Sequence, residues 1–310
     1  MPQPIRGLHV PLVTPFTSSG RVDLVALERL AHHCLDEGAA GLVALGTTGE
    51  PATLTDAERD AVVDCCAAVC AARGALLTVA AGGNDTARAE VELDRRSQRK
   101  GVGAILSVVP PYSRPARAGI VAHFERLARA SAVPLLVYEV PQRTGTRLGG
   151  KAMLALHAAH PRIAGVKLAP TALDADTAEL VAAAPEGFAV LCGEDSLIQP
   201  LCASGAAGAI AASAHCATSR FAALIELAQA GEIAVARREA ASLVPLARSL
   251  FAEPNPSVIK GVLHRRGLIA TPDVRLPHVA ASAVAVSAAL EALDAVERAA
   301  ATAPTAVASY

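Results

Sequence analysis

Short apolar runs alternate with longer segments of helical periodicity along most of this chain, and few folds accommodate such a pattern. Eight apolar runs can be marked, at residues 8–15, 41–46, 76–81, 104–109, 135–140, 163–168, 189–192 and 208–212. Between them, apolar residues recur with helical spacing, as at 24–37, 56–72, 86–100 and 117–131. Strands that alternate with helices indicate parallel βα units, and eight such units predict an α/β protein with a (β/α)8 TIM barrel.

The helical pattern continues beyond the eighth apolar run, at 218–230, 233–251, 257–267 and 280–299. A barrel needs only the first of these helices to complete its eighth unit. We therefore divide the chain into a barrel at 1–231 and an appended C-terminal helical segment at 232–299. Residues 300–310 are rich in Ala and Thr, and we expect them to form a disordered tail.

A doubly wound sheet is the alternative fold for such an alternation. It would bind a ligand at a switch point, commonly through a glycine-rich loop that follows a strand. The glycines at 82–83 and 101–103 do not form the G-x-G-x-x-G pattern, so the barrel is favoured.

Charge and cysteine usage limit the partners and the compartment. The formal net charge is −1, which argues against nucleic acid and anionic membranes as partners, and no run of about 18 apolar residues predicts a membrane span. The first apolar run contains Pro11 and Pro15 and is too short for the core of a signal peptide. The seven cysteines are odd in number and irregularly spaced, so we expect reduced thiols, no metal site and a cytoplasmic location.

One lysine stands where a buried strand is expected. The chain uses four lysines against 24 arginines, and Lys167 lies inside the apolar run 163–168. An amine in an apolar environment favours its neutral form, which can attack a carbonyl carbon, whereas a guanidinium stays protonated. Lys167 is therefore a candidate Schiff-base nucleophile. The alternative is a lysine at a strand end whose ammonium reaches water.

Other reactive side chains follow the predicted strands, at the end of a barrel where active sites form. They are Thr47 and Thr48 after the second strand, Tyr112 after the fourth, and Tyr138 and Arg143 at the end of the fifth. Each has an ordinary structural explanation, as a turn, a packed ring or a solvated loop residue. Their coincidence at one barrel mouth favours a shared site. Hydroxyls can carry the protons that imine chemistry requires, and an arginine can bind a carboxylate.

Several motifs resemble those of one enzyme superfamily. They are G-T-T-G-E at 46–50, P-Y-S-R-P at 111–115, L-V-Y-E-V-P-Q-R-T-G at 136–145, G-V-K at 165–167, G-E-D at 193–195 and E-P-N-P at 253–256. Over residues 5–295 the chain is similar to the pyruvate-dependent class I aldolases typified by dihydrodipicolinate synthase and N-acetylneuraminate lyase. The G-T-T-G-E, Y-x-R-P and R-T-G motifs place it nearest the dihydrodipicolinate synthases.

This resemblance implies a catalytic set. Lys167 would form the Schiff base with pyruvate, and Tyr138 would assist proton transfer beside it. Thr47 would link Tyr138 to Tyr112 in a proton relay, with Tyr112 supplied by a neighbouring subunit. Family members are usually homotetramers built from tight dimers, and they use neither a metal nor an organic cofactor.

The resemblance also implies the substrates and how they bind. Thr48 would bind the carboxylate of pyruvate, and Arg143 the carboxylate of aspartate semialdehyde, the acceptor aldehyde. Gly193 and Ile210 would line the pocket. The implied enzyme is a carbon–oxygen lyase of lysine biosynthesis, acting on small molecules.

The chain departs from the dihydrodipicolinate synthase pattern at two places. Glu139 stands where an Asn or Asp usually follows the tyrosine, and Leu168 and the residues after it replace an acidic residue and a Gly-containing loop. Both departures concern the acceptor more than the imine. One alternative is therefore a pyruvate-type aldolase or dehydratase acting on a sugar acid or another 2-oxo acid. The other is a catalytically silent barrel that binds a metabolite.

The cleft in which the family's sensitive members bind the inhibitor lysine is also altered. The positions concerned carry small polar, histidine, acidic and tyrosine residues in lysine-sensitive enzymes; here they are Pro51, Asp56, Arg59, Arg88 and Pro111. We therefore predict that lysine does not inhibit this protein.

Overall fold

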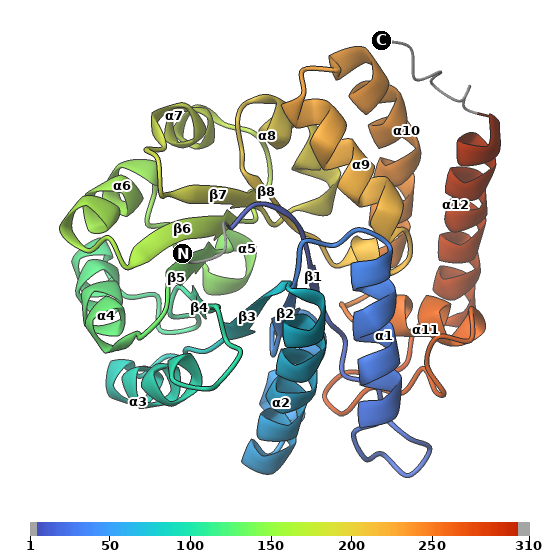
Figure 1. Cartoon of the computed structure of the whole chain (residues 1–310), viewed down its shortest axis with the longest axis horizontal. Helices are drawn as coiled ribbons and strands as arrows, with labels where there is room; N and C mark the ends of the chain where they lie inside the picture. Colours follow the sequence, from blue (N-terminus) through green and yellow to red (C-terminus); the bar gives the residue numbers. More distant parts are fainter. Residues whose placement is uncertain (1–4, 303–310) are drawn as a thin grey trace.

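The computed structural model describes residues 5–302 and shows a closed barrel of eight parallel strands surrounded by helices (Figure 1). The strands follow chain order around the barrel: β1 (Gly7–Pro11), β2 (Gly41–Ala44), β3 (Leu76–Ala80), β4 (Ala104–Val108), β5 (Leu135–Glu139), β6 (Ile163–Leu168), β7 (Ala189–Cys192) and β8 (Gly208–Ile210). His9 on β1 pairs with Ile210 on β8, which closes the sheet. The predicted (β/α)8 architecture is confirmed.

Helices connect and extend these strands. They are α1 (Leu24–Asp36), α2 (Asp56–Arg73), α3 (Thr86–Ser97), α4 (Arg117–Ala130), α5 (Pro141–Thr144), α6 (Gly150–Ala159), α7 (Ala175–Ala183), α8 (Ile198–Ala203), α9 (Thr218–Gln229), α10 (Ile233–Leu250), α11 (Ser257–Arg265) and α12 (Ala283–Thr302). Short 3-10 turns lie in the loops after β2, β7 and β8: η1 (Thr47–Gly49), η2 (Pro51–Thr53), η3 (Asp195–Leu197) and η4 (Ser213–His215). Local sequence explains where α2 begins, because Thr55 and Glu58 form a reciprocal capping box.

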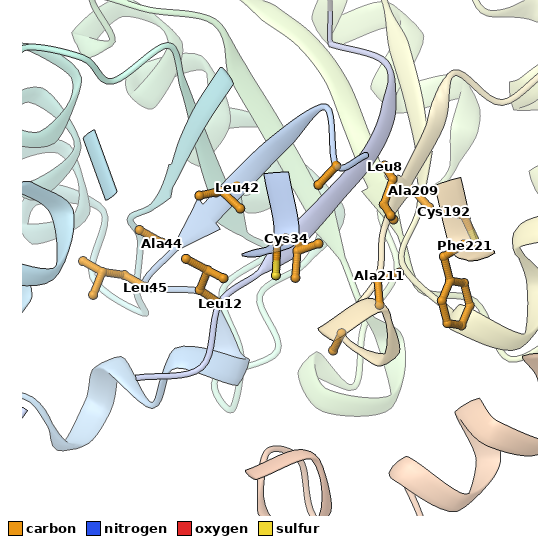
Figure 2. Close-up of a cluster of buried hydrophobic side chains, with 14 of the residues drawn as sticks. Leu8, Leu12, Cys34, Leu42, Ala44, Leu45, Cys192, Ala209, Ala211 and Phe221 are labelled. Atoms are coloured by element: carbon orange, nitrogen blue, oxygen red, sulfur yellow. The ribbon is translucent and has the colours of Figure 1, made fainter. Parts of the chain in front are cut away.

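The strands separate two layers of apolar packing. Inside the barrel, one cluster joins side chains from β2, β4, β5, β7 and β8: Val43, Leu106, Leu136, Leu191 and Ile210. The larger cluster fills the space between the strands and the surrounding helices. Figure 2 shows part of it, with Cys34 of α1 and Phe221 of α9 directed toward side chains of the strands. The interior of the barrel is thus packed, and the open space lies at its carboxyl end.

Six of the eight strands end earlier than the apolar runs that predicted them, and only β6 and β7 end at the predicted residue. The second run extends to residue 46, but β2 ends at Ala44 because Leu45 adopts a left-handed backbone conformation, with φ of 58°. Apolar residues that follow the strands therefore belong to the loops at the barrel mouth. Among residues 5–302, no helix has both the length and the apolar character needed to cross a bilayer.

The C-terminal helices are packed onto the barrel. α10 contacts α9 and α12, and α12 also contacts α11 (Figure 1). We propose that the barrel proper ends with α9 and that the appended segment begins after Gly231, as the sequence predicts. α12 continues to Thr302, into the start of the predicted disordered tail, and the rest of that tail lies outside the described residues.

Candidate active site

A cavity of about 700 Å³ opens at the carboxyl end of the barrel. Seven of the eight predicted site residues line it: Thr47, Thr48, Tyr138, Arg143, Lys167, Gly193 and Ile210. They come from β5, β6 and β8 and from the loops after β2, β5 and β7. The barrel topology thus gathers residues that are widely separated in the sequence into one pocket.

Lys167 and Tyr138 lie side by side in this pocket. They are register partners on the neighbouring strands β6 and β5, so both side chains project to the same face of the sheet. The Nζ atom of Lys167 lies 4.5 Å from the centroid of the Tyr138 ring. Lys167 is only 9% exposed, and what remains open faces the cavity that it lines. A small ketone in the cavity can therefore reach the amine of Lys167, and the phenol ring of Tyr138 lies beside that amine.

Gly193 provides the space that the lysine side chain occupies. A Cβ atom at this position would lie 2.6 Å from the Cε atom of Lys167 and 3.1 Å from the carbonyl oxygen of Leu168. Since β7 lies next to β6, any larger residue here would displace the lysine. The glycine is thus a steric requirement for the position of Lys167.

Thr47 and Thr48 form the tight turn η1 at the cavity wall. Two non-glycine residues with left-handed backbones bracket this turn, Leu45 with φ of 58° and Glu50 with φ of 55°. Thr47 is exposed to the cavity, whereas Thr48 is buried. The hydroxyl of Thr48 accepts a hydrogen bond of 3.0 Å from Nδ2 of Asn255, which precedes α11.

Glu50 ends this turn and is held by the C-terminal segment. Its carboxylate accepts a hydrogen bond of 2.5 Å from Nζ of Lys260 on α11 and another of 2.9 Å from the backbone N–H of Arg275. Both charged side chains of the Glu50–Lys260 pair are completely buried. The turn of Thr47 and Thr48 is therefore supported by residues 210 and 225 positions further along the chain.

A buried carboxylate, Asp195, also borders the cavity. It is 6% exposed and accepts a hydrogen bond of 2.7 Å from the backbone N–H of Ser213. Burial raises the pKa of Asp195 to about 6, although this hydrogen bond and the charge of Lys167 act in the opposite direction. Asp195 thus ties the loop after β7 to the loop after β8, beside the lysine.

The loop after β5 carries Arg143, whose side chain is exposed and lines the cavity. Glu139, the residue next to Tyr138, is buried outside the cavity. It accepts hydrogen bonds of 2.6 Å and 3.2 Å from the backbone N–H groups of Leu148 and Gly149 and pairs with Arg147. Burial raises the pKa of Glu139 above its ordinary value. This departure from the family pattern therefore has a structural role, which is to anchor the end of the Arg143 loop.

Arg147 also links this loop to the segment after β6, the second place where the sequence departs from the family. Its guanidinium pairs with Asp174 at 2.5 Å and with Asp176 at 3.0 Å, and Asp174 caps α7. Arg147 thus joins Glu139, the first departure from the family pattern, to the start of α7, which follows the second.

Tyr112 is the predicted site residue that a single chain does not bring into the cavity. Its side chain is 92% exposed, and its backbone is left-handed, with φ of 62°. Within one chain the structure therefore does not assemble a contact between Tyr112 and Thr47. The family resemblance implies that this tyrosine serves a neighbouring subunit.

Sequence reasoning did not assign roles to four residues at this site: Glu50, Asp195, Asn255 and Lys260. Signals for them were present. Glu50, Asp195 and Asn255 lie within the motifs already noted, and Lys260 is one of the four lysines that made Lys167 conspicuous. In residues 5–302, no group of three or more His, Cys, Asp and Glu side chains is placed to hold a metal ion.

Comparison with known proteins identifies the family. The model of the dihydrodipicolinate synthetase family matches residues 4–295. The 4-hydroxy-tetrahydrodipicolinate synthase of Moorella thermoacetica is 38% identical over 271 residues, which cover 87% of this chain and 91% of the relative.

Solved structures agree with this assignment. The synthase of the same name from Methylacidiphilum fumariolicum SolV has a TM-score of 0.90 at 30% identity, covering 96% of this chain and 98% of that one. A dihydrodipicolinate synthase variant described as monomeric has a TM-score of 0.89 at 28% identity, covering 94% and 97% of the two chains. With its family match and its lysine-centred barrel site, this chain belongs to the dihydrodipicolinate synthetase family.

Proposed function

We propose that this protein is a lyase that condenses pyruvate with aspartate semialdehyde to 4-hydroxy-tetrahydrodipicolinate, a reaction of lysine biosynthesis. The observation that carries the proposal is the placement of Lys167 beside Tyr138 in a cavity that also presents Thr47, Thr48 and Arg143. The relatives named above support the choice of substrates, because they are synthases of this product.

The reaction begins at the lysine. The neutral amine of Lys167 attacks the keto carbon of pyruvate, and the resulting hydroxyl leaves as water when it receives a proton, giving an imine. We assign the delivery of that proton to the hydroxyl of Tyr138, because the Tyr138 ring lies beside Nζ. Loss of a proton from the methyl group then converts the imine to an enamine, whose carbon is a nucleophile.

Carbon–carbon bond formation and release complete the cycle. The enamine carbon attacks the aldehyde carbon of the acceptor, and the aldehyde oxygen takes up a proton. The amino group of the acceptor then adds to the imine carbon, which closes the ring and displaces the amine of Lys167. Lysine and hydroxyls are thereby restored, so the sequence of steps requires no cofactor.

Two side chains are assigned to hold the carboxylates of the substrates. Thr48 would donate its hydroxyl proton to the pyruvate carboxylate, since its oxygen already accepts from Asn255. Arg143, which is exposed and lines the same cavity, would bind the carboxylate of the acceptor. An arginine at this place favours an acceptor that carries an acid group.

The acceptor assignment is tested by comparing aldehydes. Wild-type protein with pyruvate should turn over aspartate semialdehyde, and Arg143→Ala should lose that turnover while imine formation with pyruvate persists. Wild-type turnover of sugar acids in place of aspartate semialdehyde would favour the alternative aldolase or dehydratase. Absence of any turnover together with tight binding of a metabolite would favour the silent barrel.

We further infer a homotetramer, a dimer of dimers, in which Tyr112 completes the relay of a neighbouring subunit. Its 92% exposure and its left-handed backbone fit a residue held for a partner, since an exposed tyrosine gains nothing from that conformation. Co-expression of Tyr112→Phe with Lys167→Ala chains tests this directly. Mixed dimers should recover one working site, whereas no recovery would assign Tyr112 to its own chain, and full activity of Tyr112→Phe alone would show that it has no role.

We also propose that the protein acts in the cytoplasm on small molecules alone, without nucleic acid or membrane partners. All seven cysteines are free thiols, which fits a reducing compartment. Fractionation of the native host with detection of the protein tests this location.

A further inference from the structure

We propose that the buried pair Glu50–Lys260, together with Asn255, is a positioning device that holds the turn of Thr47 and Thr48 ready for pyruvate. The C-terminal segment would then belong to the substrate site rather than merely extend the barrel. This inference rests on the proposed function, because it takes pyruvate as the molecule that the turn binds.

The ion pair is well formed and closed to solvent. Nζ of Lys260 donates to Glu50 at 2.5 Å and to the carbonyl oxygen of Asp273 at 2.8 Å, and it lies 4.0 Å from the centroid of the Phe16 ring. Neither side chain of the pair is exposed. A buried pair adds little net stability compared with apolar residues of the same size, but it fixes one geometry. Stability alone is therefore a poor reason for its presence next to the cavity.

The turn that it holds is strained. Leu45 and Glu50 both have left-handed backbones although neither is glycine. This conformation costs free energy and persists only where the surrounding structure imposes it. On the Glu50 side, both carboxylate oxygens are bound by the C-terminal segment, one by Lys260 and one by the N–H of Arg275. These contacts fix the point at which the turn ends.

A second contact reaches the hydroxyl of Thr48, which we propose binds pyruvate. Asn255 donates to the hydroxyl oxygen of Thr48 at 3.0 Å. Because this oxygen accepts from Asn255, the hydroxyl proton of Thr48 is free to be donated to another group, and both residues line the cavity. Asn255 thus sets the direction in which Thr48 can donate. The amide touches neither Lys167 nor the reacting carbon in the mechanism above, so it is a positioning residue.

Arg275 connects the device to the rest of the wall. Its guanidinium binds both carboxylate oxygens of Glu58, at 2.6 Å and 2.8 Å, and Glu58 completes the cap of α2. The turn, the start of α2 and the C-terminal segment therefore form one hydrogen-bonded unit. Weakening the contacts of the C-terminal segment should therefore increase the mobility of the Thr47–Thr48 turn more than that of β6.

The experiment compares three variants with the wild type. Asn255→Ala removes the hydrogen bond to Thr48 without leaving a buried charge. The double variant Glu50→Gln/Lys260→Met removes both charges together, which avoids an uncompensated ion. The control Arg220→Met/Glu239→Gln breaks an ion pair between α9 and α10 in which both side chains are largely buried, away from the turn.

Two readouts are used on each full-length protein. The first is the pyruvate concentration that gives half-maximal borohydride-trapped adduct, together with KM and kcat. The second is hydrogen–deuterium exchange of residues 45–54 without substrate. We expect the half-saturating pyruvate concentration to rise by about tenfold or more in the Asn255 and Glu50/Lys260 variants, as loss of an oriented hydrogen bond would produce. Exchange in 45–54 should accelerate in both, while the maximal adduct yield and the control variant stay near wild type.

The outcomes separate this inference from the proposed function. An adduct in the wild type with unchanged half-saturation and unchanged exchange in both variants would overturn the positioning device and leave the function intact. Absence of a wild-type adduct would overturn the function. If the double variant fails to fold, Asn255→Ala still decides, since faster exchange in 45–54 supports the device and wild-type exchange refutes it.

Discussion

The Nζ atom of Lys167 lies 4.5 Å from the centroid of the Tyr138 ring, and the two residues are register partners on adjacent strands. This relationship is built into the sheet itself, because in-register residues of neighbouring parallel strands point to the same face. The proposed nucleophile and the proposed proton donor therefore do not depend on a flexible loop for their proximity. Loops bring Thr47, Thr48, Arg143 and Gly193 to this pair, whereas Ile210 lies on β8.

Tyr138→Phe should distinguish the contribution of the Tyr138 hydroxyl to catalysis from the contribution of its ring to packing. The ring keeps its contact with Lys167, so folding and pyruvate binding should be retained, while kcat falls by about 10²- to 10⁴-fold, the usual contribution of a positioned acid or base. Steady-state kinetics and trapped-adduct formation rates measure the effect. A kcat within a factor of about two of wild type would remove Tyr138 from the proton-transfer role.

Gly193→Ala should disable the lysine by crowding it. The new methyl group would lie 2.6 Å from Cε of Lys167 and 3.1 Å from a backbone oxygen, so the lysine must leave its position. We expect loss of pyruvate adduct at a nearly unchanged melting temperature. Gly119→Ala is the matched control, since its methyl group would meet Pro115 at an ordinary 3.6 Å. Normal adduct formation in Gly193→Ala would show that the pocket accommodates the methyl group without displacing Lys167, which would contradict the prediction.

Stability should fall as the pH drops below neutrality because of His215. Its Nδ1–H donates to the Ala212 carbonyl, while Nε2 accepts from the N–H of Val13, so the folded ring is neutral at both nitrogens. Burial lowers the pKa of His215 to about 4, from the ordinary 6.5. The unfolded chain therefore binds the proton first, and folding loses about 2 kcal/mol from this group between pH 7 and pH 5.

Denaturant unfolding of wild type and His215→Gln at several pH values isolates this contribution. Subtraction removes the effects of other groups, including Asp195, whose raised pKa acts in the opposite sense over part of this range. The difference in unfolding free energy between the two proteins should shrink from pH 7 to pH 5. A constant difference would show that His215 titrates normally in the fold.

Lysine should not inhibit the protein. One of the altered positions is occupied by Arg59, whose guanidinium binds the Asp56 carboxylate at 3.0 Å and the Pro51 carbonyl at 3.0 Å. These contacts hold a cationic side chain in the altered cleft, and like charges repel the ammonium groups that lysine carries. Activity measured at millimolar lysine, beside a lysine-sensitive relative, should be unaffected. Strong inhibition would contradict this prediction.

The barrel could be predicted from the sequence because its signal is repetitive. Eight apolar runs mark the strands, and the helical pattern at 56–72 agrees closely with α2, which begins at Asp56. The carboxyl ends of the strands were less predictable. At Leu45, an apolar residue leaves the strand through its backbone conformation, which side-chain patterns do not report.

The site could be predicted only in part. Lys167 and the residues of the motifs were found because their types are unusual where they stand. Lys260 is just as rare, but its partner Glu50 lies about 210 residues away, and nothing in local sequence reports such a contact. Tyr112 is exposed and lies outside the cavity of its own chain, and no pattern within one chain can place the neighbouring subunit that we propose for it. Long-range pairs such as Glu50 and Lys260 are therefore the part that needed a structure.

The central claim is that Lys167 forms an imine with pyruvate, and intact-protein mass spectrometry after treatment with pyruvate and borohydride tests it most directly. We expect a lactyl-sized mass increase in the wild type, located at Lys167 by peptide mapping, and none in Lys167→Ala. An adduct that survives in Lys167→Ala, or its absence from the wild type at saturating pyruvate, would contradict the account.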